Sequence, residues 1–530
     1  MTLAQYALKN RHSYPILAAY VNGEIRELSY TLKEGESYRW IDQRDSDGIR
    51  ILQRGLTFLF YIALRELFPD REMDLLHSLS EGLYFEVSGE PLHRSDIRRI
   101  WERMEELRLA DLPFLKCEMS IPEAAERYDA QGLHWKKDII VYKHNPVATM
   151  YELNGYIHYF FGYMPSSTGA LPAFELMSYA PGLILRHPTQ SHPWSIPPFV
   201  EQPKLHGVFM ESGLWANLLG VSDVSQLNAI VAEENKIREL IQVQEALQEK
   251  KIAHIADMIK EKNSRVILVA GPSSSGKTTF THRLKIQLMA NGVFPESISL
   301  DNYFINRANT PLDEDGNPDY ESLVALDLPQ LNRDLTLLLE GEEVSLPIYD
   351  FLTGQRSSDV IVMQLAPDQP IILEGIHGLN DQLTPDIHSK DKFKVYISAL
   401  TQLNLDKHNR IPTTDNRLIR RMVRDYATRG HSAEQTIEMW PSVQRGESQH
   451  IFPFQESADA IFNSALVYEL AVLKKTALPL LEEIKQGSPI YAQAKRLKKF
   501  LYYFESIDDD SWVPSTSLLR EFIGGSSILP

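Results

Sequence analysis

A glycine-rich segment near the middle of the chain constrains the fold more than any other feature. It follows the apolar run VILVA, residues 266–270, which predicts a buried strand, and it reads GPSSSGKT, residues 271–278, in the pattern G-x-x-x-x-G-K-[ST]. The glycines let the backbone curl so that consecutive N–H groups point at phosphate oxygens, and the helix that begins at Thr279 adds a partial positive charge. This order of strand, loop and helix predicts a phosphate-binding loop in an α/β domain.

The loop predicts a bound nucleoside triphosphate with Mg²⁺. Lys277 is expected to bridge the β- and γ-phosphates of ATP, and the hydroxyl of Thr278 is expected to hold Mg²⁺. The alternative is an ordinary serine- and glycine-rich turn between a strand and a helix. The residues expected to hold ATP are Gly271, Ser273, Ser274, Ser275, Gly276, Lys277, Thr278 and Thr279.

Two later apolar strands each end on an acidic residue. Asp301 follows SISL, residues 297–300, and Glu374 follows PIIL, residues 370–373. Residues just past the C-terminal ends of parallel strands line the ligand crevice of such a sheet. Asp301 could there accept a proton from a substrate hydroxyl, and Glu374 could bind Mg²⁺ or one of its waters. Either acid could instead be an incidental residue of a turn.

Arginines recur at helical spacing in the segment DNRLIRRMVRDYATRG. Arg417, Arg420, Arg421 and Arg424 stand at i, i+3, i+4 and i+7, so they are expected to share one helix face, with Arg429 just beyond it. Clustered guanidinium groups suit the charge that develops on a transferring phosphoryl group. We favour this catalytic role over simple pairing with the acids of an acidic chain.

Charge and composition narrow the range of partners. A formal net charge of −17 argues against a general nucleic-acid coat or a membrane-surface protein. The single cysteine, Cys117, excludes a disulfide framework and a cysteine-rich metal site. No run of about 18 apolar residues and no signal-peptide core occurs, so a cytoplasmic location is expected.

The chain has 530 residues, too many for one ordinary core, and is expected to be multidomain. Residues 1–225 mix alternating and amphipathic runs, which predicts α+β structure. From 263 to 475, apolar strands alternate with helical patterns, which predicts an α/β domain with a parallel sheet. A stretch without Pro or Gly at 226–262 predicts one long helix between them, and residues 476–530 predict a helical tail. These helices could serve a homodimer.

Six segments within residues 264–465 resemble the uridine kinase and phosphoribulokinase group of P-loop kinases. They are, in the order of that family, GPSSSGKTTF, LDNYF, YESLVALDLP, LPIYDFLTGQR, IILEGIHGL and DNRLIRRMVRDYATRG. The resemblance implies a kinase that uses ATP and Mg²⁺, with Asp301 as the general base. Glu321 then binds ribose hydroxyls, and Arg424 and Arg429 are lid arginines that act with Lys277 in catalysis. The residues expected to contact the acceptor are Tyr303, Glu321, Tyr349, Phe351 and Arg421.

The same segments depart from uridine–cytidine kinases where those enzymes read the base. Gly354 stands where they have a histidine, and Met439 stands where they have a glutamine that hydrogen-bonds the base. His431 replaces a lid arginine, and Phe304 replaces a tyrosine. Loss of two polar contacts to the base removes the means of reading a pyrimidine edge, so the identity of the acceptor stays open.

The N-terminal region resembles the N-terminal half of threonyl-tRNA synthetases. AAYVNGEIRELSYTL looks like their TGS domain, expected at 1–60, and RGLTFLFYIALRELFPD, SEGLYFE and FGYMPSSTGALPAFEL look like their editing domain, expected at 61–225. That domain carries H-x-x-x-H and C-x-x-x-H pairs, and the residues at these four positions here cannot form a metal-like cluster. We therefore expect a degenerate editing fold that binds or regulates, or a structural cap. The four residues are Arg54, Phe58, Phe160 and Met164.

Together these features predict an ATP-dependent kinase that phosphorylates a hydroxyl of a nucleoside or a related ribosyl compound. A kinase of non-nucleoside sugar phosphates is the alternative among enzymes, and the aromatic residues Tyr303, Phe304, Tyr349 and Phe351 favour the nucleoside. A nucleotide-sensing RNA-binding regulator is the alternative from another class, and the overall acidity opposes it. The expected main partner is a small molecule, not a nucleic acid or a membrane.

Overall fold

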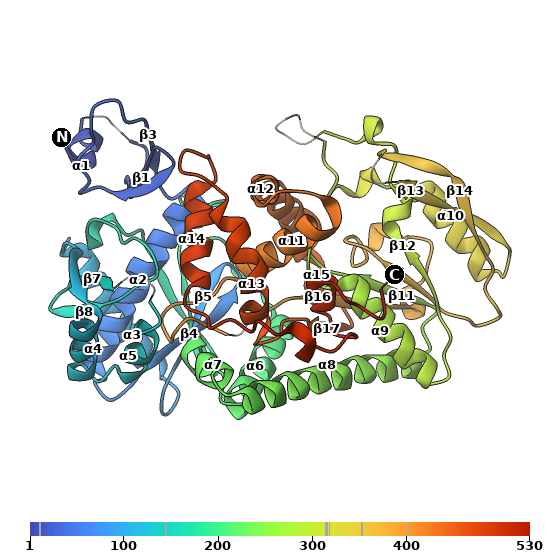
Figure 1. Cartoon of the computed structure of the whole chain (residues 1–530), viewed down its shortest axis with the longest axis horizontal. Helices are drawn as coiled ribbons and strands as arrows, with labels where there is room; N and C mark the ends of the chain where they lie inside the picture. The colour runs from blue at the N-terminus through green and yellow to red at the C-terminus, as the bar shows by residue number, and fades with distance from the viewer. Residues whose placement is uncertain are drawn as a thin grey trace.

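The computed structural model describes residues 1–9, 12–143, 146–312, 316, 318–350, 353–401 and 403–529. An N-terminal half with three small antiparallel sheets and a C-terminal half with one five-stranded parallel sheet lie at opposite ends of the molecule (Figure 1). Helix α8 (Glu234–Lys262) runs along one side from one half to the other. The structure confirms an α+β region followed by an α/β region with a parallel sheet.

The chain begins with a small unit, residues 1–45, called here the N-terminal module. It contains α1 (Leu3–Ala7) and a sheet in the order β2-β1-β3, and it ends where α2 (Ser46–Leu67) begins. The boundary expected at residue 60 therefore falls inside a helix. The apolar stretch that suggested a new domain is the buried middle of α2, where every residue from Gly55 to Leu64 is buried. The strands are β1 (Ala18–Val21), β2 (Glu24–Glu27) and β3 (Tyr38–Ile41).

Helix α2 is the centre of the next region, which adds two sheets and three helices around it. One sheet has the order β4-β5-β10-β9 and the other has the order β6-β7-β8. The strands are β4 (Met73–Leu79), β5 (Gly82–Val87), β6 (Leu115–Ser120), β7 (Val147–Leu153), β8 (Tyr156–His158), β9 (Glu175–Tyr179) and β10 (Gly182–Arg186). The helices are α3 (Arg94–Leu109), α4 (Ile121–Ala130) and α5 (His134–Ile140).

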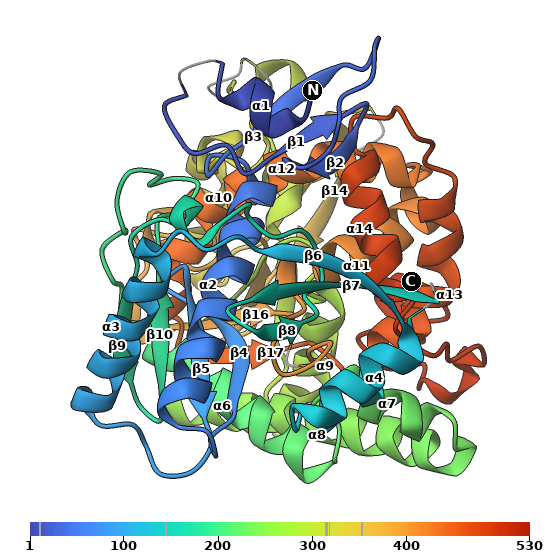
Figure 2. The ribbon, with the colours of Figure 1, turned by 90° about the vertical axis from the view of Figure 1, so that its left-hand side faces the viewer.

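The connection between the halves is a packed part of the structure. After α6 (Pro203–Leu218), the single helix expected at 226–262 forms as two, α7 (Val224–Val231) and α8, because the backbone at Glu233 is extended. One end of α8 buries Ile237 and Ile241 in the core of the N-terminal half, and the other end buries Ile255 and Ile259 against the parallel sheet. Figure 2 shows α8 passing beneath the N-terminal half.

The parallel sheet has the order β12-β15-β11-β16-β17. Strand β11 lies at its centre and is buried throughout, as expected for an apolar strand covered on both faces. Glu374, at the end of β15, is in register with Val269 of β11 on one side and with Ser299 of β12 on the other. The loops after these three strands therefore leave from the same edge. The strands are β11 (Val266–Ala270), β12 (Glu296–Ser299), β15 (Ile371–Glu374), β16 (Lys392–Ser398) and β17 (Ala460–Asn463).

Helices cover the sheet, and the tail returns across both halves. The boundary expected at 475 falls inside α13, and the tail is not continuously helical, because extended segments separate its two helices, α14 and α15. In Figure 1, α14 lies between the halves and the C-terminus lies beside β11. The remaining elements are α9 (Lys277–Ala290), α10 (Leu328–Leu339), β13 (Val344–Asp350), β14 (Gln355–Met363), α11 (Thr413–Arg429), α12 (Ala433–His450), α13 (Glu469–Glu482), α14 (Tyr491–Leu501) and α15 (Arg520–Ile523).

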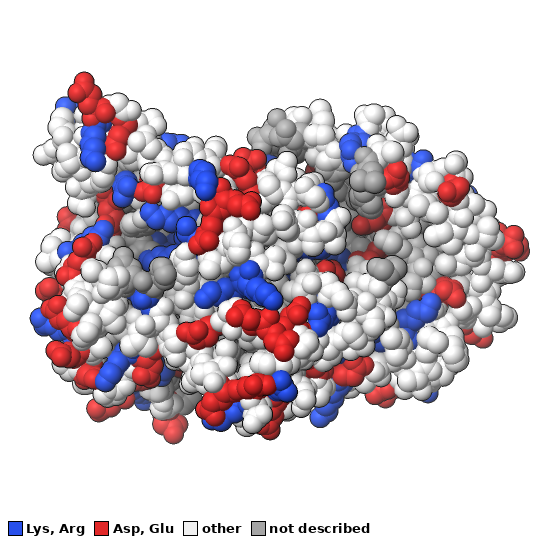
Figure 3. Space-filling model, viewed as in Figure 1, with Lys and Arg blue, Asp and Glu red and all other residues white. Residues whose placement is uncertain are grey.

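Acidic and basic side chains are interspersed over the face of the molecule shown in Figure 3. Basic side chains gather in the hollow between the N-terminal module, at the upper left of Figure 3, and the helices at its centre. Within the part of the chain that the structure describes, no helix combines the length and the apolar character needed to cross a bilayer.

A buried ion pair joins the two halves. The Nζ of Lys136 on α5 donates to Oδ2 of Asp406 at 3.0 Å and to the carbonyl oxygen of Tyr159 at 2.8 Å. Asp406 lies in the loop before α11, and it also accepts the backbone N–H groups of His408 and Asn409 at 2.8 and 2.9 Å. Burial lowers the pKa of Lys136 to about 8, although the carboxylate of Asp406 acts to raise it. The pair therefore links the two halves through a buried contact.

Replacing Lys136 is expected to destabilise the protein strongly, because it would leave the buried charge of Asp406 without its cation. We expect Lys136→Met to lower the free energy of unfolding by about 3–5 kcal/mol in urea titration. The control is Lys137→Met on the same helix, whose ion pair with Asp129 is largely exposed, so its loss should cost less than about 1 kcal/mol. Equal losses in the two variants would contradict the importance of the buried pair.

Candidate active site

The glycine-rich loop lies between the central strand β11 and the start of α9. Its backbone has the curl that the sequence predicts, with φ of +58° at Ser274 and +85° at Gly276, the residue that precedes the first turn of α9. Gly271 permits close contact with the next strand, since a Cβ there would lie 2.0 Å from the carbonyl oxygen of Ile397. The structure thus places the loop and a helix N-terminus at the edge of the sheet.

Two arginines of α11 support the loop from its backbone side. Arg417 forms a buried ion pair with Glu447 of α12 and donates to the carbonyl oxygen of Ser273 at 3.1 Å. Arg420 forms a buried ion pair with Glu469 of α13, and its Nη1 lies 3.4 Å from the carbonyl oxygen of Ser274. In place of the expected set of four arginines facing a ligand, this pair stabilises the loop.

The other three arginines gather around one buried carboxylate, Asp425. Arg424 donates to it at 2.7 Å, Arg421 at 3.2 Å, and the Nε of Arg429 lies 3.6 Å from it. Arg421 also donates to the hydroxyl of Ser273 at 2.9 Å, which links this group to the loop. Arg429 is the most exposed of the three, with 53% of its side-chain surface accessible. The structure thus holds three cations beside the loop.

The predicted carboxylates converge on Lys277. Burial raises the pKa of Asp301, and the nearby charges of Lys277 and Arg429 counteract that rise. Burial also raises the pKa of Glu374 to about 7 and that of Glu321 to about 7, and in both cases the ammonium group of Lys277 acts to lower it. The charge of Lys277 therefore reaches all three acids. The edge of the sheet therefore holds one group of opposed charges.

Glycine on α12 makes room for Glu321. A Cβ on Gly446 would lie 2.3 Å from the Cβ of Glu321, so only glycine allows the helix to pack this closely. Arg421 lies close enough to lower the pKa of Glu321, and the carboxylate of Glu447 acts to raise it. Glu321 thus packs against α12, within reach of the charges of Arg421 on α11 and Lys277 at the start of α9.

The loop and its surroundings fit a bound triphosphate. The hydroxyl groups of Ser274 and Ser275 are buried and have no hydrogen-bond partner, which is the condition of polar groups that await a ligand. Thr278 is exposed at the first turn of α9. No group of three or more His, Cys, Asp or Glu side chains able to hold a metal occurs among the described residues. Mg²⁺ would therefore rely on Thr278, an acid such as Glu374, phosphate oxygens and water.

The acceptor side differs in part from the expectation. Tyr303 was expected to contact the acceptor, but it is completely buried in the core beside α10, and its hydroxyl donates to Asp334 at 3.1 Å. The side chain therefore packs away from the crevice. Tyr349 on β13 lies beside Phe304, with ring centroids 5.7 Å apart, so these two aromatic residues do come together. Phe351, also expected here, lies outside the described residues.

The turn of the β13–β14 hairpin explains one departure from the uridine kinase pattern. Gly354 has φ of +70°, a conformation that side chains rarely adopt, and a Cβ there would lie 2.7 Å from the guanidinium group of Arg307. A histidine could not replace Gly354 without moving Arg307. Met439 lies on α12 and is partly buried. Neither residue supplies a side-chain hydrogen bond to a ligand.

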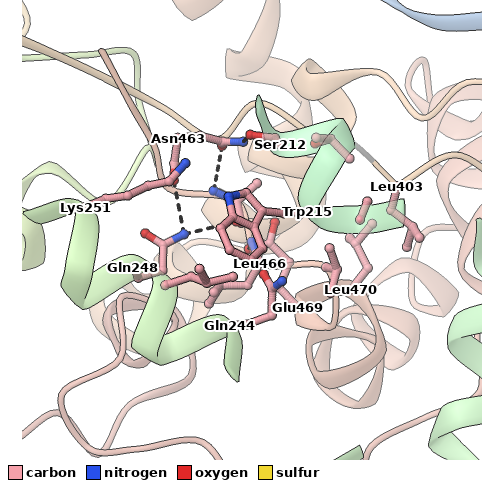
Figure 4. A pocket seen from close by; sticks show the side chains of 15 residues that line it. Ser212, Trp215, Gln244, Gln248, Lys251, Leu403, Asn463, Leu466, Glu469 and Leu470 are labelled. Carbon is pink, nitrogen blue, oxygen red and sulfur yellow. Dashed lines mark hydrogen bonds between the residues drawn. The ribbon is translucent and has the colours of Figure 1, made fainter. Parts of the chain in front are cut away.

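A separate small cavity lies behind the sheet, between α6, α8 and the loop after β17 (Figure 4). Gln248 donates to the carbonyl oxygen of Asn463 at 3.1 Å, and Asn463 donates to the hydroxyl of Ser212 at 3.2 Å. Its volume is about 60 Å³, which is too small for a nucleotide. The cavity is lined by hydrogen-bonded polar side chains from α6, α8 and the segment after β17, and it contains no residue of the glycine-rich loop.

Comparison with known proteins identifies the C-terminal half. The model of the phosphoribulokinase/uridine kinase family matches residues 266–471, and a uridine kinase of Bacillus licheniformis is 32% identical over 201 residues, which cover 38% of this chain and 86% of that enzyme. The chain belongs to the phosphoribulokinase/uridine kinase family. A solved structure described as a possible uridine kinase from Bacillus stearothermophilus is 21% identical, covers 38% of this chain and 89% of that chain, and has a TM-score of 0.25. Family membership supports a phosphotransferase that uses ATP and Mg²⁺.

Another part of the chain is similar to a tRNA ligase. A threonine–tRNA ligase of Marinobacter nauticus is 31% identical over 166 residues, which cover 31% of this chain but only 26% of the ligase. Of the residues at the expected cluster positions, Phe58 and Phe160 are in contact, with ring centroids 5.3 Å apart, and Arg54 donates to the carbonyl oxygen of Tyr163, the residue before Met164, at 2.8 Å. Met164, the fourth, is buried. Their chemistry offers a metal no set of ligands.

An acid from the tail, which no sequence pattern predicts, contacts the first turn of α9. The carboxylate of Glu521 on α15 accepts the hydroxyl of Thr279 at 2.9 Å and its backbone N–H at 3.3 Å. Leu518 packs beside the loop, 3.3 Å from the position of a Cβ on Gly276. The N-terminus of a helix is a favourable place for a phosphate group, and Thr279 lies at that end of α9. Glu521 therefore takes donors that a phosphate would use.

Removing the charge of Glu521 is expected to tighten the binding of ATP, because a carboxylate beside the loop both repels phosphates and competes for the donors of Thr279. We expect Glu521→Gln to lower the Kd for ATP by roughly ten- to a hundredfold in calorimetry, because a charge-assisted hydrogen bond contributes about 1.5–3 kcal/mol. The exposed Glu483 at the end of α13 offers the control Glu483→Gln, which should leave the Kd unchanged. Unchanged or weaker binding in Glu521→Gln would show that the carboxylate does not compete.

Proposed function

We propose that the chain transfers a phosphoryl group from ATP to a hydroxyl of a nucleoside or a related ribosyl compound. The observation that carries the proposal is the convergence of Lys277 with Asp301, Glu321 and Glu374 at one edge of the sheet, beside an unfilled set of donors in the loop. Several relatives that align with most of their length on this half are named uridine kinases, which favours the nucleoside.

ATP supplies the phosphoryl group, and Mg²⁺ neutralises part of its charge. The chain contributes the donors of the loop, the cation of Lys277 and the three arginines around Asp425, all of which favour negative charge at this edge. Asp301 is suited to take the proton of the acceptor hydroxyl, since burial raises its pKa and makes it a stronger base. The neighbouring charges of Lys277 and Arg429 oppose that rise of the pKa.

The acceptor would lie against Glu321 and the aromatic pair formed by Phe304 and Tyr349. A carboxylate can accept hydrogen bonds from two neighbouring hydroxyls, as on a ribose, and aromatic faces suit a planar base. Arg307 lies against Gly354, where the relatives' histidine would stand, and this cation favours the second candidate function, a kinase of a phosphorylated sugar. The two candidates differ in whether the acceptor carries a base or a phosphate.

The role of Asp301 predicts a large loss of rate without a large loss of nucleotide affinity. We expect Asp301→Asn to lower kcat by at least roughly a hundredfold, because the amide cannot take the proton, while the Kd for ATP hardly changes. The control is Asp359→Asn, at an exposed position of β14, which should keep full activity. A strong loss of ATP affinity with a modest loss of rate would make Asp301 a metal ligand instead.

The acceptor pocket predicts weak discrimination between bases. Because neither Gly354 nor Met439 offers a hydrogen bond to a base edge, kcat/KM for uridine, cytidine, adenosine and guanosine should differ by much less than the roughly ten-thousandfold that hydrogen-bonding sites achieve. An assay of ATP consumption with ribose 5-phosphate as the acceptor tests the second candidate function, a kinase of a phosphorylated sugar. A preference near ten-thousandfold for one pyrimidine would show that other residues read the base, and activity on the sugar phosphate alone would overturn the nucleoside proposal.

A further inference from the structure

A second cavity, far larger than the one in Figure 4, lies in the N-terminal half. Its volume is about 630 Å³, within the range of small-molecule sites, and it shares no residue with the glycine-rich loop. The N-terminal module and α2 form part of its wall, β6 and β7 form another part, and α14 of the tail closes it. Figure 2 shows α14 beside these strands, and the hollow of Figure 3 lies over the same elements. We call it the basic cavity.

Positive charge is concentrated in the basic cavity. Nine of its lining residues are Lys or Arg and three are Asp or Glu, although the chain as a whole carries a net charge of −17. Some of these cations are paired, such as Lys495 with Glu24 at 3.1 Å and Lys116 with Glu27 at 2.9 Å. An excess of positive charge in one cavity of a chain whose net charge is negative indicates a site for an anion.

Two cations at the centre of the basic cavity have no acidic partner among the described residues. Arg54 donates only to the backbone carbonyl groups of Tyr163, at 2.8 Å, and Phe161, at 3.5 Å. Lys499, on α14, makes no ion pair and lies over the ring of Phe161, with Nζ 4.9 Å from the ring centre. Both are therefore cations of the cavity wall that form no ion pair in the described part of the chain, and the carboxylate of Asp47, whose charge acts on Arg54, is already paired with Arg50 at 2.8 Å.

The cations also repel one another. Burial, together with the charges of Lys143 and Arg54, lowers the pKa of Lys499 to about 7. Burial likewise lowers the pKa of Arg54 to about 10. A bound anion would relieve this repulsion and restore the charge of Lys499, so the geometry and the electrostatics point the same way.

Aromatic side chains complete the basic cavity. Tyr159, Phe161 and Tyr163 follow one another along the loop after β8 and line it, and Tyr502 and Tyr503 at the end of α14 face them. Aromatic faces accept planar rings, and clustered Lys and Arg accept phosphate. A molecule that combines a planar ring with a phosphate group, in a volume of this size, is a nucleotide.

We propose that the basic cavity binds a small nucleotide through its phosphate, at a site separate from the glycine-rich loop. A long polyanion such as RNA suits it less, because residues of the tail helix α14 form part of its wall and the chain as a whole carries a net charge of −17. The ligand would contact both the N-terminal half and the tail. Lys499 and Arg54 would bind the phosphate group.

The test uses the full chain with Lys277→Ala, which removes the phosphate-binding lysine of the loop. Calorimetry with AMP and inorganic phosphate should show a site for a nucleoside monophosphate, whereas uridine, which lacks the phosphate, should bind only at the acceptor site beside Glu321, with an affinity that Lys499→Gln and Arg54→Gln leave unchanged. Adding Lys499→Gln or Arg54→Gln should weaken the binding of AMP by about tenfold or more. Adding Lys485→Gln, at an exposed position outside the cavity, should leave it unchanged.

The outcomes separate the alternatives. Because Lys499 has no acidic partner and is repelled by its neighbours, Lys499→Gln should fold at least as stably as the parent, which thermal melting checks. Equal affinities with and without Lys499→Gln and Arg54→Gln, or no binding of any monophosphate, would overturn the proposal. Binding of inorganic phosphate as tight as that of AMP would overturn the nucleotide part of it. Binding of a short single-stranded RNA but of no mononucleotide would assign the site to RNA instead.

Discussion

The orientation of the two halves depends on one buried charge pair, Lys136 with Asp406. Neither group is exposed, and Asp406 accepts two backbone N–H groups as well, so the pair has little freedom to rearrange. Beside it, His158 of the N-terminal half and His408 of the same loop lie 2.7 Å apart, both buried. Because polar groups buried in this way tolerate few geometries, they specify a single docking of the halves. The helix α8 and the tail can then pack against both.

The C-terminal half was the more predictable of the two from sequence. The order of strand, loop and helix at residues 266–290 is local, and the convergence of Asp301 and Glu374 follows from the rule that parallel strands end at one edge. The strand register confirms this. Glu374 pairs with Val269, two residues before the glycine-rich loop, and with Ser299, two residues before Asp301. The orientation of the Tyr303 side chain could not be predicted, because the helical turn at Leu300–Tyr303 is too short for a sequence pattern to show which side chain faces the core. Two of the expected domain limits, at 60 and 475, fall inside helices for a similar reason, since apolar helices continue across them.

Contacts between distant residues were beyond the reach of sequence patterns. Glu521 meets Thr279 across 242 positions of the chain, and the basic cavity joins residues of the N-terminal module to those of α14. Arginines at helical spacing predicted one shared face, yet Arg417 and Arg420 are drawn inward by Glu447 and Glu469, which lie on other helices. A helical period identifies neighbours on one helix, and it cannot say which neighbouring helix supplies an acid. Long-range partners of this kind require the fold.

The contact between Glu521 and Thr279 has a consequence for how this chain would respond to its surroundings. A group tethered to the same chain competes at an effective concentration of the order of millimolar, and dilution does not weaken it. Nucleotide in solution would have to exceed that internal competitor, so the threshold for occupancy would be set by the chain and not by protein concentration. Since the tail also runs through α14, anything that tightens or loosens that helix would shift the threshold. The C-terminal segment would then set the nucleotide concentration at which the glycine-rich loop becomes occupied.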